Sequence, residues 1–259
     1  MLKELYTAAL GMVPQQTRLE VLSNNIANAN TVGFKRESAF ERSLISAQAN
    51  LNNVKGDVES EDTPTDTYTD FGQGAAERTG NQFDFAIDNK KGYFTLEDSE
   101  GKQYFSRAGH FTLGQDGKIE TADGLALMGE NGPIYVNQQK FLPGQMDDTK
   151  AILLRVEETG EVFANEQTVG RIQLTDIENP QTLVRETGAQ FSATDNTVMN
   201  PVPIEEASIR QGYVENSNVN IIKEMVEMIE LQRMFEMGQK VITTNDGTLD
   251  RSIEIGRFG

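Results

Sequence analysis

Residues 221–249 read IIKEMVEMIELQRMFEMGQKVITTNDGTL and carry the strongest periodic pattern in this chain of 259 residues. Apolar residues recur there every seven residues, at Ile221, Met228, Phe235, Ile242 and Leu249, and Met225, Leu231, Met234 and Val241 widen the stripe. Such a repeat predicts an amphipathic helix that packs along a partner helix. We expect this helix to begin after the run Asn216–Asn220, whose side chains can cap it, with Glu224 near the positive end of the helix dipole.

The first segment of the chain carries a matching pattern. Seven-residue spacing relates Leu5, Met12, Leu19 and Ile26, and each is followed three residues later by Ala8, Gln15, Leu22 or Ala29. This spacing predicts a second helix with a narrow apolar seam that one polar residue, Gln15, interrupts. Pro14 removes one backbone donor, so we expect it to bend the helix without dividing it. The run NANTVG at residues 28–33 favours the end of the helix there.

Between these segments the sequence changes character. Residues 57–70 include six acidic residues and four threonines without any lysine or arginine, which predicts a solvated loop. Short runs rich in β-branched and aromatic residues follow, and they are interrupted by turn residues. The runs span residues 93–96, 103–106, 110–113, 152–156, 161–164 and 171–174, and the turns are expected at Gly101, Gly117, Gly124 and Gly132. This pattern predicts an antiparallel β domain.

The expected fold class is therefore α+β, with long N- and C-terminal helices forming a coiled-coil-like pair and an antiparallel all-β domain inserted between them. The expected segments are an N-terminal helix and assembly motif (1–35), an extended linker with an acidic loop (36–82), the β domain (83–202), a return segment (203–216) and a C-terminal helix (217–259). One helix pair cannot bury both seams completely, so the remaining apolar surface predicts self-association. Packing of the heptads within one monomer stays open as the alternative.

Composition excludes several classes of function. Forty acidic residues against 23 basic ones give a formal charge of −17, which disfavours nucleic acid as a partner. No apolar run reaches the roughly 20 residues that span a bilayer, so direct membrane insertion is not expected. Cysteine is absent, His110 has no accompanying nucleophile signature, and the acidic run lacks the spacing of a calcium loop. We therefore predict no catalytic, cofactor-binding or metal-binding residues and no enzymatic activity.

The stretch SNNIANANTVGFKR at residues 23–36 resembles the N-terminal signature of the flagellar rod and hook proteins, N-N-[IL]-A-N-x-N-T-x-G-F-[KR]. Residues 6–12 and 212–226 also resemble segments of that family, and so do residues 84–87 and 105–109 in the middle of the chain. The resemblance thus covers most of the chain. A plain helix terminus followed by a turn is the alternative explanation of the asparagine-rich motif.

The resemblance implies a structural subunit of the bacterial flagellar basal-body rod, located in the periplasm and exported by the flagellar type III export apparatus without a cleaved signal peptide. It also implies helical polymerisation with copies of itself and with other rod proteins. The terminal helices would form the inner tube, the middle domain the outer layer, and the rod would transmit torque from motor to hook. A proximal-rod position is slightly favoured over a distal-rod one.

Two alternatives remain open for the function. One is a hook-type axial subunit. The other, from a different class, is a secreted adhesin or carbohydrate-binding β domain on a coiled-coil stalk, which would form a small closed oligomer.

The predicted assembly-interface residues come from the two seams and the family motifs. They are Leu5, Met12, Leu19, Leu22, Asn24, Asn25, Ile26, Asn28, Asn30, Thr31, Gly33, Phe34, Asn216, Ser217, Asn218, Val219, Asn220, Ile221, Met225, Met228, Phe235, Ile242 and Leu249.

Overall fold

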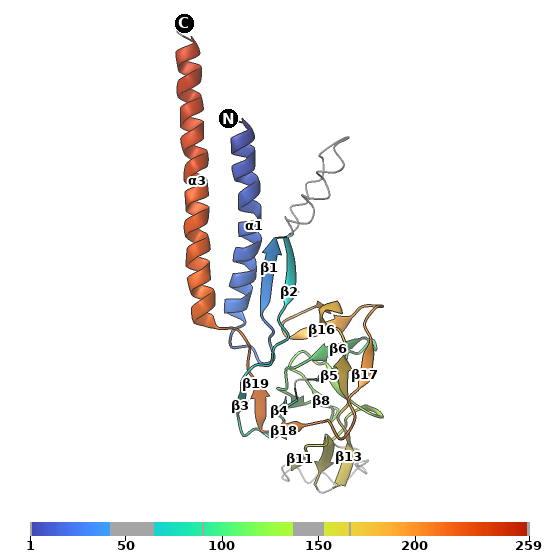
Figure 1. The fold of residues 1–259 in the computed structure, drawn as a ribbon. Helices are drawn as coiled ribbons and strands as arrows, with labels where there is room; N and C mark the ends of the chain where they lie inside the picture. The colour runs from blue at the N-terminus through green and yellow to red at the C-terminus, as the bar shows by residue number, and fades with distance from the viewer. Residues whose placement is uncertain (1, 42–64, 90, 137–152, 166, 258–259) are drawn as a thin grey trace. The chain divides into compact units, whose positions relative to one another are not determined.

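A computed structural model describes residues 2–41, 65–89, 91–136, 153–165 and 167–257. Within these residues there are two α-helices and nineteen strands (Figure 1). The helices are α1 (Leu2–Ala27) and α3 (Ile221–Arg257), together with a short 3₁₀ helix, η1 (Pro180–Thr182). The strands are β1 (Glu37–Glu41), β2 (Thr65–Thr69), β3 (Ala76–Arg78), β4 (Phe85–Ile87), β5 (Tyr93–Glu97), β6 (Gln103–Ser106), β7 (Thr112–Leu113), β8 (Ile119–Glu120), β9 (Ala126–Gly129), β10 (Gly132–Pro133), β11 (Leu154–Val156), β12 (Glu161–Ala164), β13 (Gln167–Arg171), β14 (Leu174–Ile177), β15 (Leu183–Arg185), β16 (Gln190–Ala193), β17 (Met199–Pro201), β18 (Ile209–Gln211) and β19 (Tyr213–Glu215).

The chain divides into two compact units. The helical unit comprises Met1–Ala27, Arg36–Asp70 and Val219–Gly259, and the β unit comprises Asn28–Lys35 and Phe71–Asn218. The chain therefore enters the β unit directly after α1, returns to the helical unit at β1, and passes through the β unit once more before α3.

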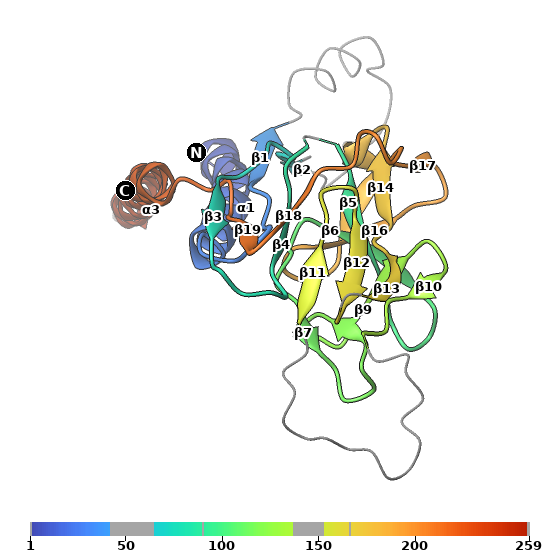
Figure 2. The ribbon, with the colours of Figure 1, turned by 90° about the horizontal axis from the view of Figure 1, so that it is seen from below.

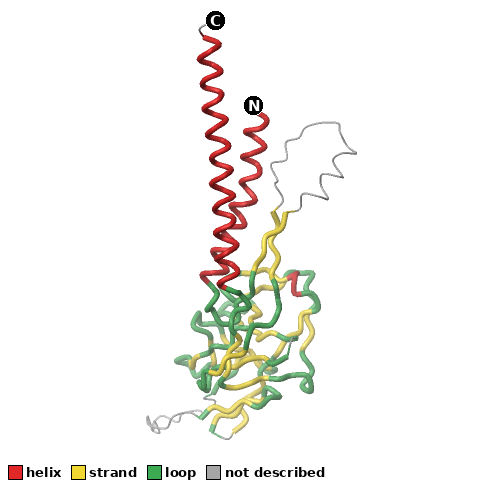
Figure 3. The backbone as a smooth tube through the Cα atoms, turned by 60° about the vertical axis from the view of Figure 1, so that its left-hand side comes forward, coloured by secondary structure: helices red, strands yellow, loops and turns green. Residues whose placement is uncertain are grey.

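In the helical unit, α1 and α3 run side by side in opposite directions (Figures 1 and 3). Helix α1 is continuous through Pro14 and ends at Ala27, as the asparagine-rich run predicted. Helix α3 begins at Ile221, as predicted, with Glu224 in its first turn. The antiparallel hairpin of β1 and β2 completes the unit, with β1 packed against α1. Strand β2 lies where the sequence predicted an acidic loop, and residues 57–64 of that run lie outside the described residues.

The β unit is built on one large sheet. Its main strand order is β15-β16-β6-β5-β9-β8-β7, with β10 pairing β9 and with β14 pairing both β5 and β17. The hairpin of β5 and β6 fixes the centre, with Thr95 opposite Phe105 and Glu97 opposite Gln103. A smaller sheet of β11, β12 and β13 is visible in Figure 2. Short pairs of β18 with β4 and of β19 with β3 carry the return of the chain.

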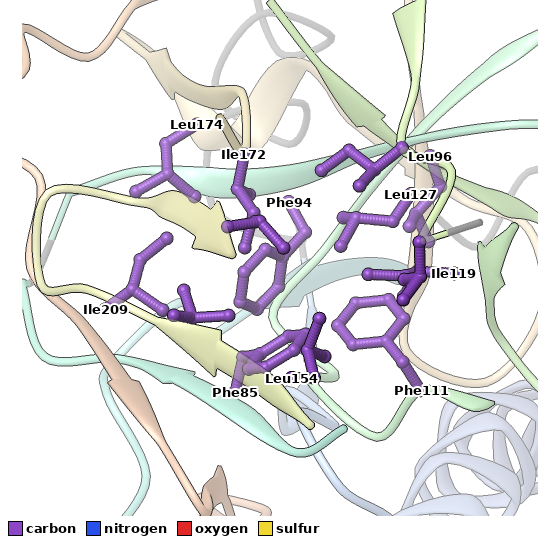
Figure 4. Packing of buried hydrophobic residues seen from close by; sticks show 14 of the residues in the cluster. Phe85, Phe94, Leu96, Phe111, Ile119, Leu127, Leu154, Ile172, Leu174 and Ile209 are labelled. Atoms are coloured by element: carbon purple, nitrogen blue, oxygen red, sulfur yellow. The ribbon is translucent and has the colours of Figure 1, made fainter. Parts of the chain in front are cut away.

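The hydrophobic core of the β unit lies among these sheets. Phe85, Phe94 and Phe111 are fully buried and their rings meet, with centroid separations of 5.6 Å for Phe85–Phe111 and 5.4 Å for Phe94–Phe111 (Figure 4). Aliphatic side chains from strands of both sheets, among them Leu127 and Leu154, surround the three rings. The core is thus assembled from residues far apart in the chain.

The predicted fold class, with long terminal helices forming a coiled-coil-like pair around an inserted β domain, is wrong. The described residues form mainly β-sheet, and of the two helices the N-terminal one is the shorter. A seven-residue repeat predicts which face of a helix is apolar, but it does not say what covers that face. Here β1 packs on α1 within the helical unit, so strands are not confined to a middle insertion. Buried polar groups also lie where the helices meet.

Individual strands and turns agree more closely with the predictions made from the sequence. The runs at 93–96, 103–106 and 161–164 are confirmed as strands, and all four predicted turn glycines have positive φ. The run at 171–174 is instead divided, because β13 ends at Arg171 and Ile172 forms an isolated bridge with Gly129 before β14 begins. Of the run at 110–113, only Thr112–Leu113 forms a strand. Of the run at 152–156, Leu154–Val156 forms β11, and residue 152 lies outside the described residues.

Candidate assembly surface

One stripe of α3 is turned toward α1. Residues at alternating spacings of three and four are buried or half-buried along it, namely Ile221, Glu224, Met228, Leu231, Phe235, Gly238 and Ile242. At one point along the stripe, a Cβ at Gly238 would lie 3.4 Å from Met12 of α1. The stripe therefore keeps the seven-residue period, and a glycine provides room for the methionine of the neighbouring helix.

A buried polar cluster joins α1, α3 and β1. The carboxylate of Glu224 is fully buried, and its two oxygens accept hydrogen bonds from Asn25 Nδ2 at 3.0 Å and from Arg36 Nε at 2.6 Å. The Asn25 amide also donates to the backbone oxygen of Glu37 at 2.7 Å and accepts from the backbone nitrogen of Glu37 at 2.9 Å. Asn25 thus binds β1 as a neighbouring strand would, which holds β1 against the helices.

Arg36 supplies the positive charge of this cluster. Its guanidinium lies 2.6 Å from a Glu224 oxygen and 3.6 Å from a Glu227 oxygen. Burial alone would lower the pKa of Arg36, but the hydrogen bond and the charge of Glu224, with that of Glu227, raise it above its ordinary value. The guanidinium therefore stays charged, and it neutralises the carboxylate that α3 places in the unit's interior.

The N-terminus of α3 carries a side-chain cap. Asn220 Oδ1 accepts a hydrogen bond from the backbone nitrogen of Lys223 at 3.1 Å, which satisfies one of the donors that a helix leaves open at its start. We expect Asn220→Ala to lower the stability of the helical unit by about 1 kcal/mol, measured by chemical denaturation followed through helical circular dichroism. Gln239→Ala, at an exposed position within α3, is the matched control. Equal stability of the two variants would contradict a capping role.

The opposite side of α3 exposes apolar residues. Ile222 is 77% exposed and Met237 60%, and Met225, Val226, Ile229, Met234 and Val241 are each between 41% and 53% exposed. Scattered apolar residues are normal on protein surfaces, but this set lies on one helix. Of the predicted interface residues, Met225 belongs to this exposed set.

The second half of the asparagine-rich motif lies within the β unit. Phe34 is buried, and the guanidinium of Arg185 lies 4.5 Å from the centre of its ring. Gly33 donates its backbone N–H to the backbone oxygen of Glu215 at 2.7 Å and has a φ of +70°. A Cβ at Gly33 would lie 2.2 Å from the backbone nitrogen of Ala108. This part of the motif therefore anchors the chain to the β unit.

Lys35 continues the anchor through a buried ion cluster. Its Nζ lies 2.5 Å from one oxygen of Glu215 and donates to the backbone oxygen of Gly72 at 2.9 Å. The same Glu215 oxygen accepts from the backbone nitrogen of Gly74 at 3.0 Å, and the other Glu215 oxygen lies 3.4 Å from Arg107 Nη1. All three charged side chains are at most 4% exposed, so the single carboxylate balances two buried cations.

Tyr93 borders this cluster. Its ring lies 5.2 Å from the guanidinium carbon of Arg107. Burial raises the pKa of Tyr93 to about 12, because the positive charge of Arg107 offsets only part of the cost of burying a phenolate. The hydroxyl is therefore neutral at physiological pH and adds no charge to the Glu215 cluster.

The structure distributes the predicted interface residues between the two units. Asn28, Asn30, Thr31, Gly33, Phe34, Asn216, Ser217 and Asn218 belong to the β unit, and the others belong to the helical unit. The buried ones are Leu22, Asn25, Gly33 and Phe34, and the exposed ones are Asn24, Asn30, Asn220 and Met225. The side chains of Leu5 and Leu249 lie outside the described part of the structure. All remaining predicted residues are half-buried.

Sequence reasoning missed the charged partners of these residues. Glu224 was assigned only to the helix dipole, although it occupies a position of the buried stripe, and a carboxylate at such a position signals a buried cation nearby. Arg36, Lys35, Glu215 and Arg107 were not singled out as site residues. Lys35 and Arg36 gave no periodic signal, because the carboxylates that pair with them lie about 180 residues further along the chain.

Two other features, a metal-binding cluster and a membrane-spanning helix, are not found among the described residues. No cluster of three or more histidine or acidic side chains is arranged there to hold a metal ion. Within the same residues, neither helix has a stretch that combines the length and the low polarity needed to cross a membrane.

Comparison with known proteins gives three family matches. Residues 5–35 match the family described as "Flagella basal body rod protein", residues 86–164 match "Flagellar hook protein FlgE/F/G D1 domain", and residues 210–255 match "Flagellar basal body rod FlgEFG protein C-terminal". The matches fall at both ends and in the middle of the chain.

Individual relatives align over nearly the whole chain. The chain is 31% identical to the flagellar basal-body rod protein FlgG of Bacillus subtilis, over 99% of this chain and 100% of the relative. It is 32% identical to FlgG of Caulobacter vibrioides, over 98% and 99%. It is also 30% identical to the flagellar basal-body rod protein FlgF of Caulobacter vibrioides, over 96% and 95%.

Proposed function

This chain belongs to the flagellar basal-body rod proteins, and from that premise we propose that its helical unit is the part through which copies of it polymerise. It is a FlgF- or FlgG-like structural subunit of the bacterial flagellar basal-body rod. Its relatives are structural proteins, which supports an architectural rather than an enzymatic role. Relatives of both types have similar identities to the chain, so either rod position agrees with them.

The observation that carries the proposal is the second apolar face of α3. One face is covered by α1, whereas Ile222, Val226 and Ile229 on another face are each at least half exposed. Fully burying such a side chain stabilises by about 1.5–3 kcal/mol, so covering the half that is still exposed contributes about half as much. Because several of them lie on a single helix, side-by-side packing of copies would cover them together. Helical polymerisation follows when each copy repeats the same head-to-tail contact and the series does not close into a ring.

The two ends of the chain and its middle would then have separate tasks. We assign residues 1–35 and 217–259, which contain the helices, to the inner tube of the rod, and residues 83–202 to its outer layer. The buried Glu215 cluster supports this assignment. It joins the segment that follows α1 in the sequence, at Lys35, to the segment that precedes α3, at Glu215, without any contact made by the helices. Such an arrangement would let the rod transmit torque through a rigid wall.

The proposal extends to partners and location. The chain belongs in the flagellar basal body, and the rod proteins assemble with other basal-body components. We further propose that it forms homopolymers, contacts other rod proteins, and reaches the periplasm through the flagellar type III export apparatus. The absence of cysteine agrees with this route, since no disulfide has to be avoided or formed on the way.

The first test replaces Ile222 and Val226 by glutamate. Charges on the exposed stripe would have to be buried at every contact, so we expect the critical concentration for polymerisation to rise at least about tenfold. Pelleting assays and electron microscopy of the purified protein measure it. Gln239→Glu adds one such charge at an exposed position outside the stripe, and this control is expected to polymerise as the unmodified protein does; the Ile222→Glu and Val226→Glu single variants, which each add one charge, are compared with it.

Two outcomes would count against the proposal. One is unchanged polymerisation of the Ile222 and Val226 variant. The other is a closed dimer or trimer of the unmodified protein that does not grow with concentration, which would favour the adhesin-like alternative.

A further inference from the structure

A cavity of about 170 Å³ lies inside the helical unit, between α1, β1 and α3. Its apolar lining comes from Val21 and Leu22 of α1 and from Leu231 of α3, all buried, with the exposed Met234 beside them. A cavity of about 150 Å³ has room for a benzene-sized molecule. The space is therefore large enough for one long side chain, whose apolar part would pack on these three buried residues, while polar residues such as Arg18 and Ser38 line the rest of it.

The charged residues around the cavity carry one net negative charge. The acidic ones are Glu37, Glu227 and Glu230, and the basic ones are Arg18 and Arg36. The charge of Arg36 is already engaged, because this residue is ion-paired with the buried Glu224 and lies 3.6 Å from Glu227. The surroundings of the apolar lining thus favour an incoming side chain that has positive charges next to it.

The exposed face of α3 offers a side chain of that kind. Met237 is 60% exposed, and on a helix its neighbours at four residues before and three residues after are Arg233 and Lys240, both exposed. Among the exposed apolar residues of α3 that the structure describes, Met237 alone has a cation on each side at these spacings. The methionine side chain is unbranched and flexible, which suits an irregular cavity.

We propose that the cavity lined by Val21, Leu22 and Leu231 is a socket for Met237 of a second copy of this chain. Arg233 and Lys240 of that copy then lie over the acidic rim that Glu37 and Glu230 provide. This inference rests on the proposed polymerisation and adds to it the particular contact between copies.

Met237→Ser tests the apolar part of the contact. Loss of the buried thioether is expected to raise the critical concentration for polymerisation about tenfold, while circular dichroism of the monomer stays unchanged because Met237 is exposed. Gln239→Ser is the matched control on the same helix and is expected to have no effect.

Charge exchange tests the polar part. Glu230→Lys and Lys240→Glu are each expected to raise the critical concentration about two- to fivefold. The double variant is expected to polymerise within about twofold of the unmodified protein, because the pair is restored with its signs reversed. Glu236→Lys combined with Lys240→Glu is the control, and it should give no such rescue.

A third measurement locates the contact directly. Since the chain has no cysteine, Ser38→Cys in one tagged copy and Met237→Cys in a differently tagged copy provide the only thiols. A short bis-maleimide should join the two tags in assembled material, and a Gln239→Cys copy should not be joined to Ser38→Cys.

The outcomes separate the two levels of the proposal. Normal filaments from Met237→Ser, failure of the charge exchange to rescue, or absence of the cross-link in filaments would overturn the socket and leave polymerisation intact. If the unmodified protein forms no polymer at any concentration, the socket and the proposed function both fail.

Discussion

Replacing Glu215 by alanine is expected to destabilise the β unit by about 3–5 kcal/mol, because it leaves the buried cations of Lys35 and Arg107 without their shared carboxylate. The backbone N–H of Gly74 loses its acceptor as well. For a unit of this size the change corresponds to a fall in melting temperature of roughly 10 °C. Calorimetry, or chemical denaturation followed by tyrosine fluorescence, measures it.

Two variants separate the contributions to that effect. Glu215→Gln keeps the volume and an acceptor oxygen but removes the charge, so we expect a loss of stability that is large but smaller than for alanine. Glu186→Ala breaks the 2.9 Å pair with Lys102, in which both side chains are more than a third exposed, and is expected to leave stability nearly unchanged. A Glu215→Ala protein as stable as Glu186→Ala would show that the buried cluster does not hold the β unit together.

The periodic patterns predicted the local elements well. The seven-residue spacing identified the buried stripe of α3, but Met225, Met234 and Val241, which were expected to widen it, are exposed. Turn glycines such as Gly101 and Gly124 marked where strands reverse. These features depend on residues close together in the chain, and local sequence determines them directly. The strands that pair across long separations, such as β14 with β5 and β18 with β4, could not be assigned from such patterns.

The fold class was wrong for a related physical reason. Residues close together in the chain determine which face of a helix is apolar, but tertiary contacts determine what covers that face. Here these contacts are the hydrogen bonds that Asn25 makes to Glu37 and Glu224. An asparagine in a family motif gave no indication that its amide would bind the edge of a strand. The same holds for Lys35, whose carboxylate partner follows 180 residues later.

Replacing Gly33 by alanine is expected to destabilise the β unit by about 2–5 kcal/mol, for two reasons that add. The left-handed backbone at Gly33, with a φ of +70°, costs an L-residue about 1–2 kcal/mol. The new Cβ would also lie 2.2 Å from the nitrogen and 2.5 Å from the Cα of Ala108, and these backbone atoms cannot turn aside as a flexible side chain would. Overpacking of this kind typically adds about 1–3 kcal/mol.

Gly124→Ala isolates the first reason, the backbone cost, because Gly124 has a similar φ of +82° but nothing within 4 Å of its would-be Cβ. It should lose only the backbone contribution of about 1–2 kcal/mol. The difference between the two variants in free energy of unfolding therefore measures the contact with Ala108. If the two variants were equally stable, the close approach at residue 108 would not explain why the motif has a glycine at residue 33. If Gly33→Ala is the less stable, the glycine is required by folding of the β unit, whether or not it also takes part in assembly.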